Sequence, residues 1–194
     1  MQRAVLLLAL ALPMTSATSR YDAMPTQRKI DLIEQGRIPA GTMLTFEERE
    51  LNVYLQKKSR EVIPDGLREP HVTLNDGRVT GKAFVDFVKM RHAQGEDMNW
   101  LMSSLLKGEY PIRVEGRVAS SKGTARVDLD VVQVGGASLK GRALDLLVRT
   151  FVLPLYPNAK VGTQFELGYN VDRIELKPGA AQVVIAGKET GAKR

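Results

Sequence analysis

Ser104 and Lys107 have the spacing of a catalytic serine–lysine pair. In such a pair, one helical turn brings the lysine amine to the serine hydroxyl and activates it as a nucleophile. Penicillin-interactive enzymes of this type also carry Ser-Asp-Asn and Lys-Thr-Gly motifs, and neither occurs in this sequence. We therefore interpret the pair as a chance match on an amphipathic helix.

His92, Glu96 and Asp97 form a polar cluster that could hold a metal or act as a general base. Transition-metal sites usually need three or four ligands, mostly histidine and cysteine. The chain has two histidines and no cysteine. We interpret the cluster as a hydrophilic loop and predict no metal site.

Asp128 and Asp130 lie two residues apart on a predicted strand, so both carboxylates point to one face. Paired carboxylates can do acid–base work or bind calcium. Arg126 beside them favours an ordinary solvated face instead.

Gly135 and Gly136 lie between a predicted strand and a predicted helix, where backbone N–H groups can bind an anion. The spacing of nucleotide-binding loops is absent, which favours a tight turn. With no other catalytic motif, the sequence predicts a protein that is not an enzyme and has no cofactor.

Three helices and three hairpins are predicted to position these residues. A short helix is predicted at 27–36, and Thr45 and Glu48 have capping-box spacing before a second helix that ends near 62. Another short helix is predicted at 98–106. Alternating apolar residues predict hairpins that turn at 75–77, 120–123 and 178–179, the last with a bulge near Asp172 and Arg173.

The segment 138–155 is apolar on almost every side. Its polar residues Arg142, Asp145 and Arg149 form one narrow stripe. A helix of this kind must be enclosed on most sides. We therefore predict an α+β fold in which a curved antiparallel sheet wraps around a long apolar helix, with additional N-terminal helices.

The first 19 residues have the features of a cleavable signal peptide. Arg3, the apolar run 4–12 and the small-residue stretch 13–19 follow in the order that signal peptidase reads. We expect cleavage after Ala17 or Ser19 and a periplasmic or secreted protein; an uncleaved anchor, which would make it membrane-associated, is the alternative. The predicted divisions are a signal peptide at 1–19, a linker and short helix at 20–43, one α+β domain at 44–187 and a basic tail at 188–194.

The formal net charge is +6, but lysine and arginine are mostly scattered singly. No basic stripe is mixed with aromatic residues, so we predict no nucleic-acid partner. A solvated basic surface explains the charge, and weak attraction to an anionic membrane surface is the alternative.

Three pieces of the sequence resemble a known family. They are the segment 44–55 (LTFEERELNVYL), the hairpin at 75–77, and the unit from 127 through the apolar helix to Pro154. Together they are similar to uncharacterised exported bacterial proteins, some of which resemble half-modules of the tubular lipid-binding (TULIP, BPI-like) superfamily. The resemblance implies a curved sheet around a long helix, with a cavity for acyl chains. It covers 44–155, assigns no functional residue, and leaves the insertion 90–106 without a counterpart.

The leading functional hypothesis is an extracytoplasmic module of the cell envelope that binds or carries a lipid or other apolar molecule. Short strands with one solvent-exposed face should leave part of the apolar helix uncovered. The predicted groove is lined by Leu146, Leu147, Phe151, Leu155, Phe165, Leu167 and Tyr169. One alternative is a structural or interaction protein with a fully packed core, in which Trp100, Leu101 and Leu105 of the insertion fill the groove. The other is an envelope hydrolase without a recognisable motif.

Overall fold

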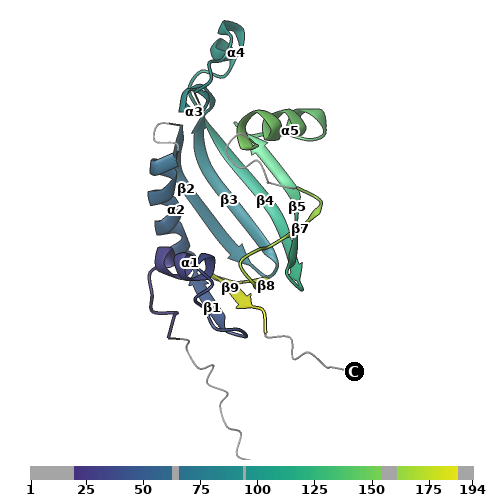
Figure 1. Cartoon of the computed structure of the whole chain (residues 1–194). Helices are drawn as coiled ribbons and strands as arrows, with labels where there is room; N and C mark the ends of the chain where they lie inside the picture. Colours follow the sequence, from purple (N-terminus) through teal and green to yellow (C-terminus); the bar gives the residue numbers. More distant parts are fainter. Residues whose placement is uncertain (1–19, 63–65, 94, 154–160, 188–194) are drawn as a thin grey trace, which may run out of the picture.

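The computed structural model describes residues 20–62, 66–93, 95–153 and 161–187, which form two antiparallel sheets with short helices around them (Figure 1). In the larger sheet the strand order is β2-β3-β4-β5-β6, and β7 also pairs with β5. Its strands are β2 (Leu67–Asn75), β3 (Arg78–Asp86), β4 (Glu109–Ser121), β5 (Thr124–Val134), β6 (Ala137–Ser138) and β7 (Gln164–Glu166). The smaller sheet has the order β1-β9-β8, with β1 (Met43–Glu47), β9 (Ala180–Ile185) and β8 (Val171–Lys177).

The helices are short and lie at the ends and along one edge of the sheets (Figure 1). The longest of those described, α2, runs beside β2, α1 lies near the small sheet, and α3, α4 and α5 lie at the opposite end of the large sheet. The helices are α1 (Thr26–Glu34), α2 (Glu48–Val62), α3 (Phe87–Ala93), α4 (Trp100–Leu105), α5 (Arg142–Leu147) and the π-helix η1 (Val148–Val152).

The predicted hairpins are confirmed. β2 turns into β3 at Asp76 and Gly77, and β4 turns into β5 at Lys122 and Gly123, where both residues have positive φ, 50° and 76°. Two positive φ values match the twist of the flanking strands, which makes this a favoured hairpin turn. The register of β8 and β9 also shifts at the predicted place, between Val171 and Arg173.

Side chains on the two faces of the large sheet differ in polarity. Cross-strand partners lie on the same face, so the register defines an inner and an outer face. The inner face carries Val72, Leu74, Val79, Gly81, Ala83, Val85, Tyr110, Ile112, Val114, Val118, Ala125, Val127, Leu129, Val132 and Val134. The outer face carries Arg78, Thr80, Lys82, Arg113, Glu115, Arg117, Arg126 and Asp128.

Two separate clusters cover the two ends of the inner face. The first joins α1 and the small sheet to the end of the large sheet near the β2–β3 turn, and its most buried side chain is Leu44. Ser120 ties the sheets together, because its hydroxyl exchanges 2.7 Å hydrogen bonds with the backbone N–H and carbonyl of Ile174. The second cluster, at the opposite end, is built on Val85, Phe87, Met90 and Phe151.

The edge strand β2 is covered by α2 through side-chain hydrogen bonds. The Asn52 amide donates to the Val72 carbonyl at 2.9 Å and accepts from the Val72 N–H at 2.7 Å. The Glu48 carboxylate accepts from the Leu74 N–H at 2.7 Å. These hydrogen bonds satisfy backbone groups of β2 that a neighbouring strand would otherwise pair. Unpaired groups on an edge strand can pair with another chain, so α2 protects this edge.

The helix predicted after Thr45 is confirmed as α2, but the capping-box prediction is wrong. Thr45 lies in β1, and its N–H donates to the Asp22 carboxylate at 2.9 Å. Glu48 is the first residue of α2 and uses its carboxylate on β2. Hydrogen bonds to Asp22 and to β2 therefore take the place of the local hydrogen bonds of a capping box.

The predicted fold class is wrong, because the sheet wraps around no long apolar helix in the part of the chain that the structure describes. Residues 137–138 form β6, and helix begins only at Arg142. No residue of α5 is buried, and Leu146 is 60% exposed. Only Phe151 of η1 is buried. The segment lies against one end of the sheet (Figure 1), so its apolar sequence marks one contact face and not enclosure.

We predict that Asn52→Ala lowers the free energy of unfolding by about 2–4 kcal/mol. The substitution leaves both the N–H and the carbonyl of Val72 without their side-chain partner, at about 1–3 kcal/mol for each unsatisfied group. Urea denaturation of both variants measures the effect, with Gln56→Ala, at an exposed position of α2, as the control. Equal stability of the two variants would contradict the role given to Asn52.

Candidate functional site

The residues predicted to line a groove do not lie together. Leu147 and Phe151 both pack in the second cluster, where the Phe151 and Phe87 rings lie 4.7 Å apart between centroids. Leu146 is exposed on α5. Leu155 lies outside the described residues.

The three remaining residues of that set lie near the opposite end. Phe165, on β7, is paired with Ala125 and so lies on the inner face. Leu167 packs against the first cluster. Tyr169 is 59% exposed and has a positive φ of 48°. Of the residues predicted to line a groove, the structure therefore brings only Leu147 and Phe151 into one cluster. Of Phe165, Leu167 and Tyr169, only Phe165 is shown by strand pairing to lie on the inner face.

The middle of the inner face belongs to neither cluster. The register aligns Val72, Gly81, Val114 and Val132 in one row across four strands. Val132 is buried, but the other three are only half-buried. The flanking residues Ala83, Val118, Val127 and Leu129 are half-buried as well. This middle row and its flanks form a continuous apolar strip that the described residues cover incompletely.

Gly81 marks open space over this strip. No described atom outside the adjoining residues lies within 4 Å of the position that a Cβ of residue 81 would take. Its φ lies outside the left-handed range, so no backbone conformation requires glycine there. A glycine in a strand interior weakens the strand and often marks a close approach of another group. No sequence signal indicates this feature, since only the strand register shows which residues lie beside Gly81.

Trp100 and Leu101 do not plug this space. They are 81% and 60% exposed on α4, beyond the end of the large sheet (Figure 1). The side chain of Leu105 is outside the described set. The two described residues of the predicted plug therefore leave the strip open.

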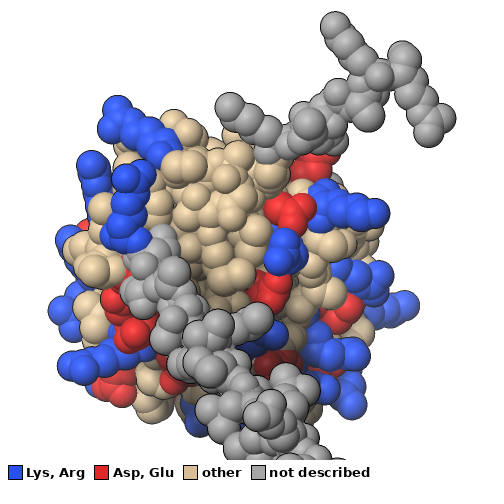
Figure 2. Space-filling view, turned by 90° about the horizontal axis from the view of Figure 1, so that it is seen from below, with Lys and Arg blue, Asp and Glu red and all other residues tan. Residues whose placement is uncertain are grey.

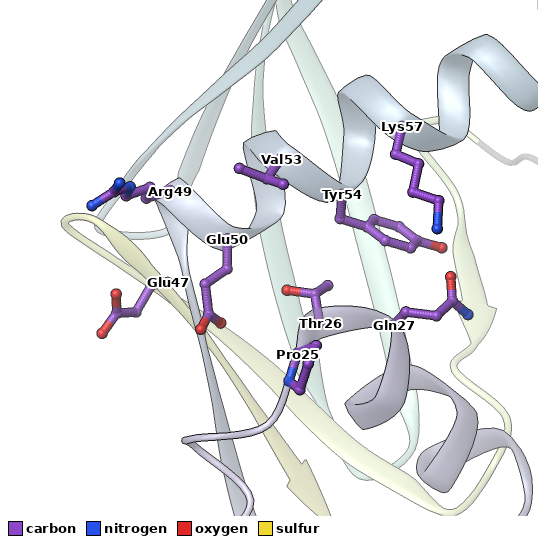
Figure 3. A pocket seen from close by; sticks show the side chains of 9 residues that line it. All are labelled: Pro25, Thr26, Gln27, Glu47, Arg49, Glu50, Val53, Tyr54 and Lys57. Atoms are coloured by element: carbon purple, nitrogen blue, oxygen red, sulfur yellow. The ribbon is translucent and has the colours of Figure 1, made fainter.

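A second candidate is the cleft between α1 and α2, with a volume of about 530 Å³ (Figure 3). Its walls include Val53 and Tyr54, and its other lining residues are Pro25, Thr26, Gln27, Glu47, Arg49, Glu50 and Lys57. The Thr26 hydroxyl is buried and has no hydrogen-bond partner among the described residues. Charges of both signs surround the cleft, so it favours neither an anion nor a cation.

Lys29 lies buried beside this cleft with 1% of its side chain exposed. Its ammonium donates to the Thr45 carbonyl at 2.7 Å and to the Glu50 carboxylate at 3.0 Å, and lies 5.3 Å from the centroid of the Phe46 ring. These contacts join α1, α2 and β1. A lysine on the same helical face as Leu32 is the sequence signal that could have revealed a buried partner.

Several charges of the outer face pair with one another. Asp130 contacts Arg78 and Arg117 at 3.1 Å and 2.9 Å. The hydrogen bond and charge of Arg126 hold the pKa of the Asp128 carboxyl below its usual range. Both aspartates pair with arginines of the same face, which supports the interpretation of this pair as part of a solvated, charged face.

The structure also places the other residues that the sequence analysis considered for catalysis, metal binding or anion binding. Ser104 is in α4, which ends at Leu105, so Lys107 lies beyond the helix. His92 and Asp97 are exposed and paired at 2.9 Å. No group of three histidine, aspartate or glutamate side chains in the described residues could hold a metal. Gly135 and Gly136 turn β5 into β6 with φ of 58° and 83°, which confirms a tight turn, though between two strands.

Charged side chains of both signs are dispersed over the surface. Figure 2, viewed from the end that carries the small sheet, shows lysine and arginine around a broad area without charge. No protein-family model matches the sequence, and no curated protein matches it. Within the described ranges, no helix has both the length and the apolar content to span a bilayer.

We predict that replacing Glu50 lowers the free energy of unfolding more than replacing Lys29, its partner in the buried ion pair. Glu50→Ala should lower the free energy of unfolding by about 2–4 kcal/mol, because it leaves a buried ammonium without its counterion. Lys29→Met should cost about 1 kcal/mol, because Glu50 is one-third exposed and water can solvate its carboxylate. Chemical denaturation of the two variants compares them, and a larger loss for Lys29→Met would refute this account.

Proposed function

We propose that the chain binds the acyl chain of a lipid, or a similar apolar ligand, against the middle of the inner face, and carries it outside the cytoplasm. The observation that carries this proposal is the open space above Gly81, within a half-exposed apolar strip on four strands. The proposed role is binding and transport, without catalysis or a cofactor.

The chemistry of the strip favours an apolar ligand over a polar one. Its members are valine, leucine, alanine and glycine, while the charged residues of the same strands lie on the outer face. Each CH₂ group that leaves water there contributes about 0.8 kcal/mol. A polar ligand would lose its hydrogen bonds to water and find no side-chain partner on the strip.

The proposal depends on the inner face and not on the family resemblance. The TULIP resemblance of 44–155 stays a prediction, and the described residues contain no long enclosed helix of the kind that it implied. Of the residues predicted to line a groove, Phe165 lies on the inner face, while Leu147 and Phe151 pack at one end of it.

Gly81→Val tests the ligand site. We expect this full-length variant to keep or gain stability, since valine suits a strand and has room there, and to bind a fluorescent fatty acid at least about tenfold more weakly than wild type. Thr80→Val changes the adjacent residue on the outer face and should leave binding unchanged. A stable Gly81→Val variant with wild-type affinity would overturn the proposal and favour a structural protein with a packed core.

The location outside the cytoplasm is proposed from residues 1–19, which lie outside the described residues. When the chain is expressed with its leader in a bacterial host, we expect export and a new N-terminus at Thr18 or Arg20. N-terminal sequencing of the exported fraction checks this. Membrane-bound material that still begins at Met1 would favour the uncleaved anchor.

A further inference from the structure

The end of the molecule opposite the small sheet exposes large apolar side chains on two short helices. Trp100, the single tryptophan of the chain, is 81% exposed on α4, and Leu101 beside it is 60% exposed. Leu146 is 60% exposed on α5. Figure 1 shows α4 projecting beyond the large sheet and α5 lying at the same end. Exposed apolar groups gathered at one end mark an interaction surface.

The second cluster holds these helices together. Met98 and Leu106, which flank α4, pack in the same cluster as Leu147 and Phe151 of the α5–η1 segment. Arg91 of α3 also donates to the Thr150 carbonyl at 3.2 Å. The exposed side chains of α4 and α5 are therefore presented by one packed unit.

Cations without counterions accompany these apolar residues. Lys107 follows α4, Lys140 and Arg142 stand at the start of α5, and Arg149 lies on η1; all four are exposed. None makes an ion pair with a residue of the described ranges. Asp145 is the one carboxylate in 139–153.

Four described carboxylates elsewhere at this end are already paired. Glu96 pairs with Arg91, and Asp97 with His92. Asp86 contacts Lys89, and Glu109 contacts Arg68. The surplus charge beside the exposed apolar side chains is therefore positive.

We propose that this end docks on a bilayer containing anionic lipid. Trp100 would lie at the level of the headgroups, where tryptophan is enriched, with Leu101 and Leu146 reaching the acyl boundary. The four cations would contact lipid phosphates. A bilayer suits side chains that project from separate helices, because it needs no pre-shaped pockets. The proposal extends the proposed function, since Leu147 and Phe151 of the same α5–η1 segment pack against one end of the inner face.

Trp100 is a native probe of docking. The apolar run 4–12 of the full chain can bind vesicles by itself, so the readout is the emission of Trp100 and not total binding. On phosphatidylcholine vesicles with phosphatidylglycerol, we expect a blue shift and quenching by brominated acyl chains. Phosphatidylcholine alone should require a higher vesicle concentration for the same shift.

Matched variants separate the apolar and the electrostatic contributions. Leu101→Ser should raise the vesicle concentration at half-maximal shift about tenfold. Lys140→Gln and Arg142→Gln should each raise it about fivefold on anionic vesicles, as expected for about 1 kcal/mol per cation. The controls on α2 are Val53→Ser, at a position 65% exposed, and Lys57→Gln; both should leave the midpoint unchanged.

The outcome distinguishes docking from ligand binding. Leu101→Ser should leave fatty-acid binding in solution intact, while Gly81→Val should leave the Trp100 shift intact. A Trp100 emission that stays unshifted at saturating anionic vesicles would overturn the docking proposal, as would a Val53→Ser effect equal to that of Leu101→Ser. Burial of Trp100 by self-association without vesicles would overturn it in favour of an interface between two copies.

Discussion

The hydrogen bonds between α2 and the backbone of β2 determine how the rest of the molecule is arranged. Asn52 and Glu48 satisfy three backbone groups on the edge of the large sheet, so α2 lies along the edge and not across a face. An edge satisfied in this way is protected against pairing with other chains. From this position at the edge, Leu51 of α2 packs against the first cluster, at one end of the inner face.

The other described helices are short and pack at the two ends of the inner face. α1 and the small sheet pack on one end of the inner face, and α3 and η1 pack on the other. The core is consequently divided in two, with half-buried residues between the parts. Contact between water and such an apolar strip is unfavourable, and a bound apolar ligand would remove it; this links the fold to the function we propose.

Local chemistry made much of the fold predictable. Turn residues and alternating polarity located all three hairpins, and the phase shift near Arg173 located the bulge in β8, because these signals act within a few residues. The segment 138–155 was misjudged because an apolar sequence does not say which element covers it. Asn52 and Lys29 were missed for a related reason: their partners, Val72 and Glu50, lie about 20 residues away along the chain. The candidate site was missed because it depends on strand register, which aligns Gly81 with Val114.

The small sheet imposes an order on folding. β1, near the N-terminal end of the described chain, pairs directly with β9, so that Met43 lies opposite Val184. Contacts between such distant segments form slowly, because closing a long loop costs entropy before any contact compensates for it. The β2–β5 meander pairs strands that follow one another in the sequence, through two tight turns and the α3–α4 connection, and can assemble first. The first cluster must wait until β9 is available, so a chain that is still being synthesised or translocated remains without one of its two cores until nearly all of it has emerged.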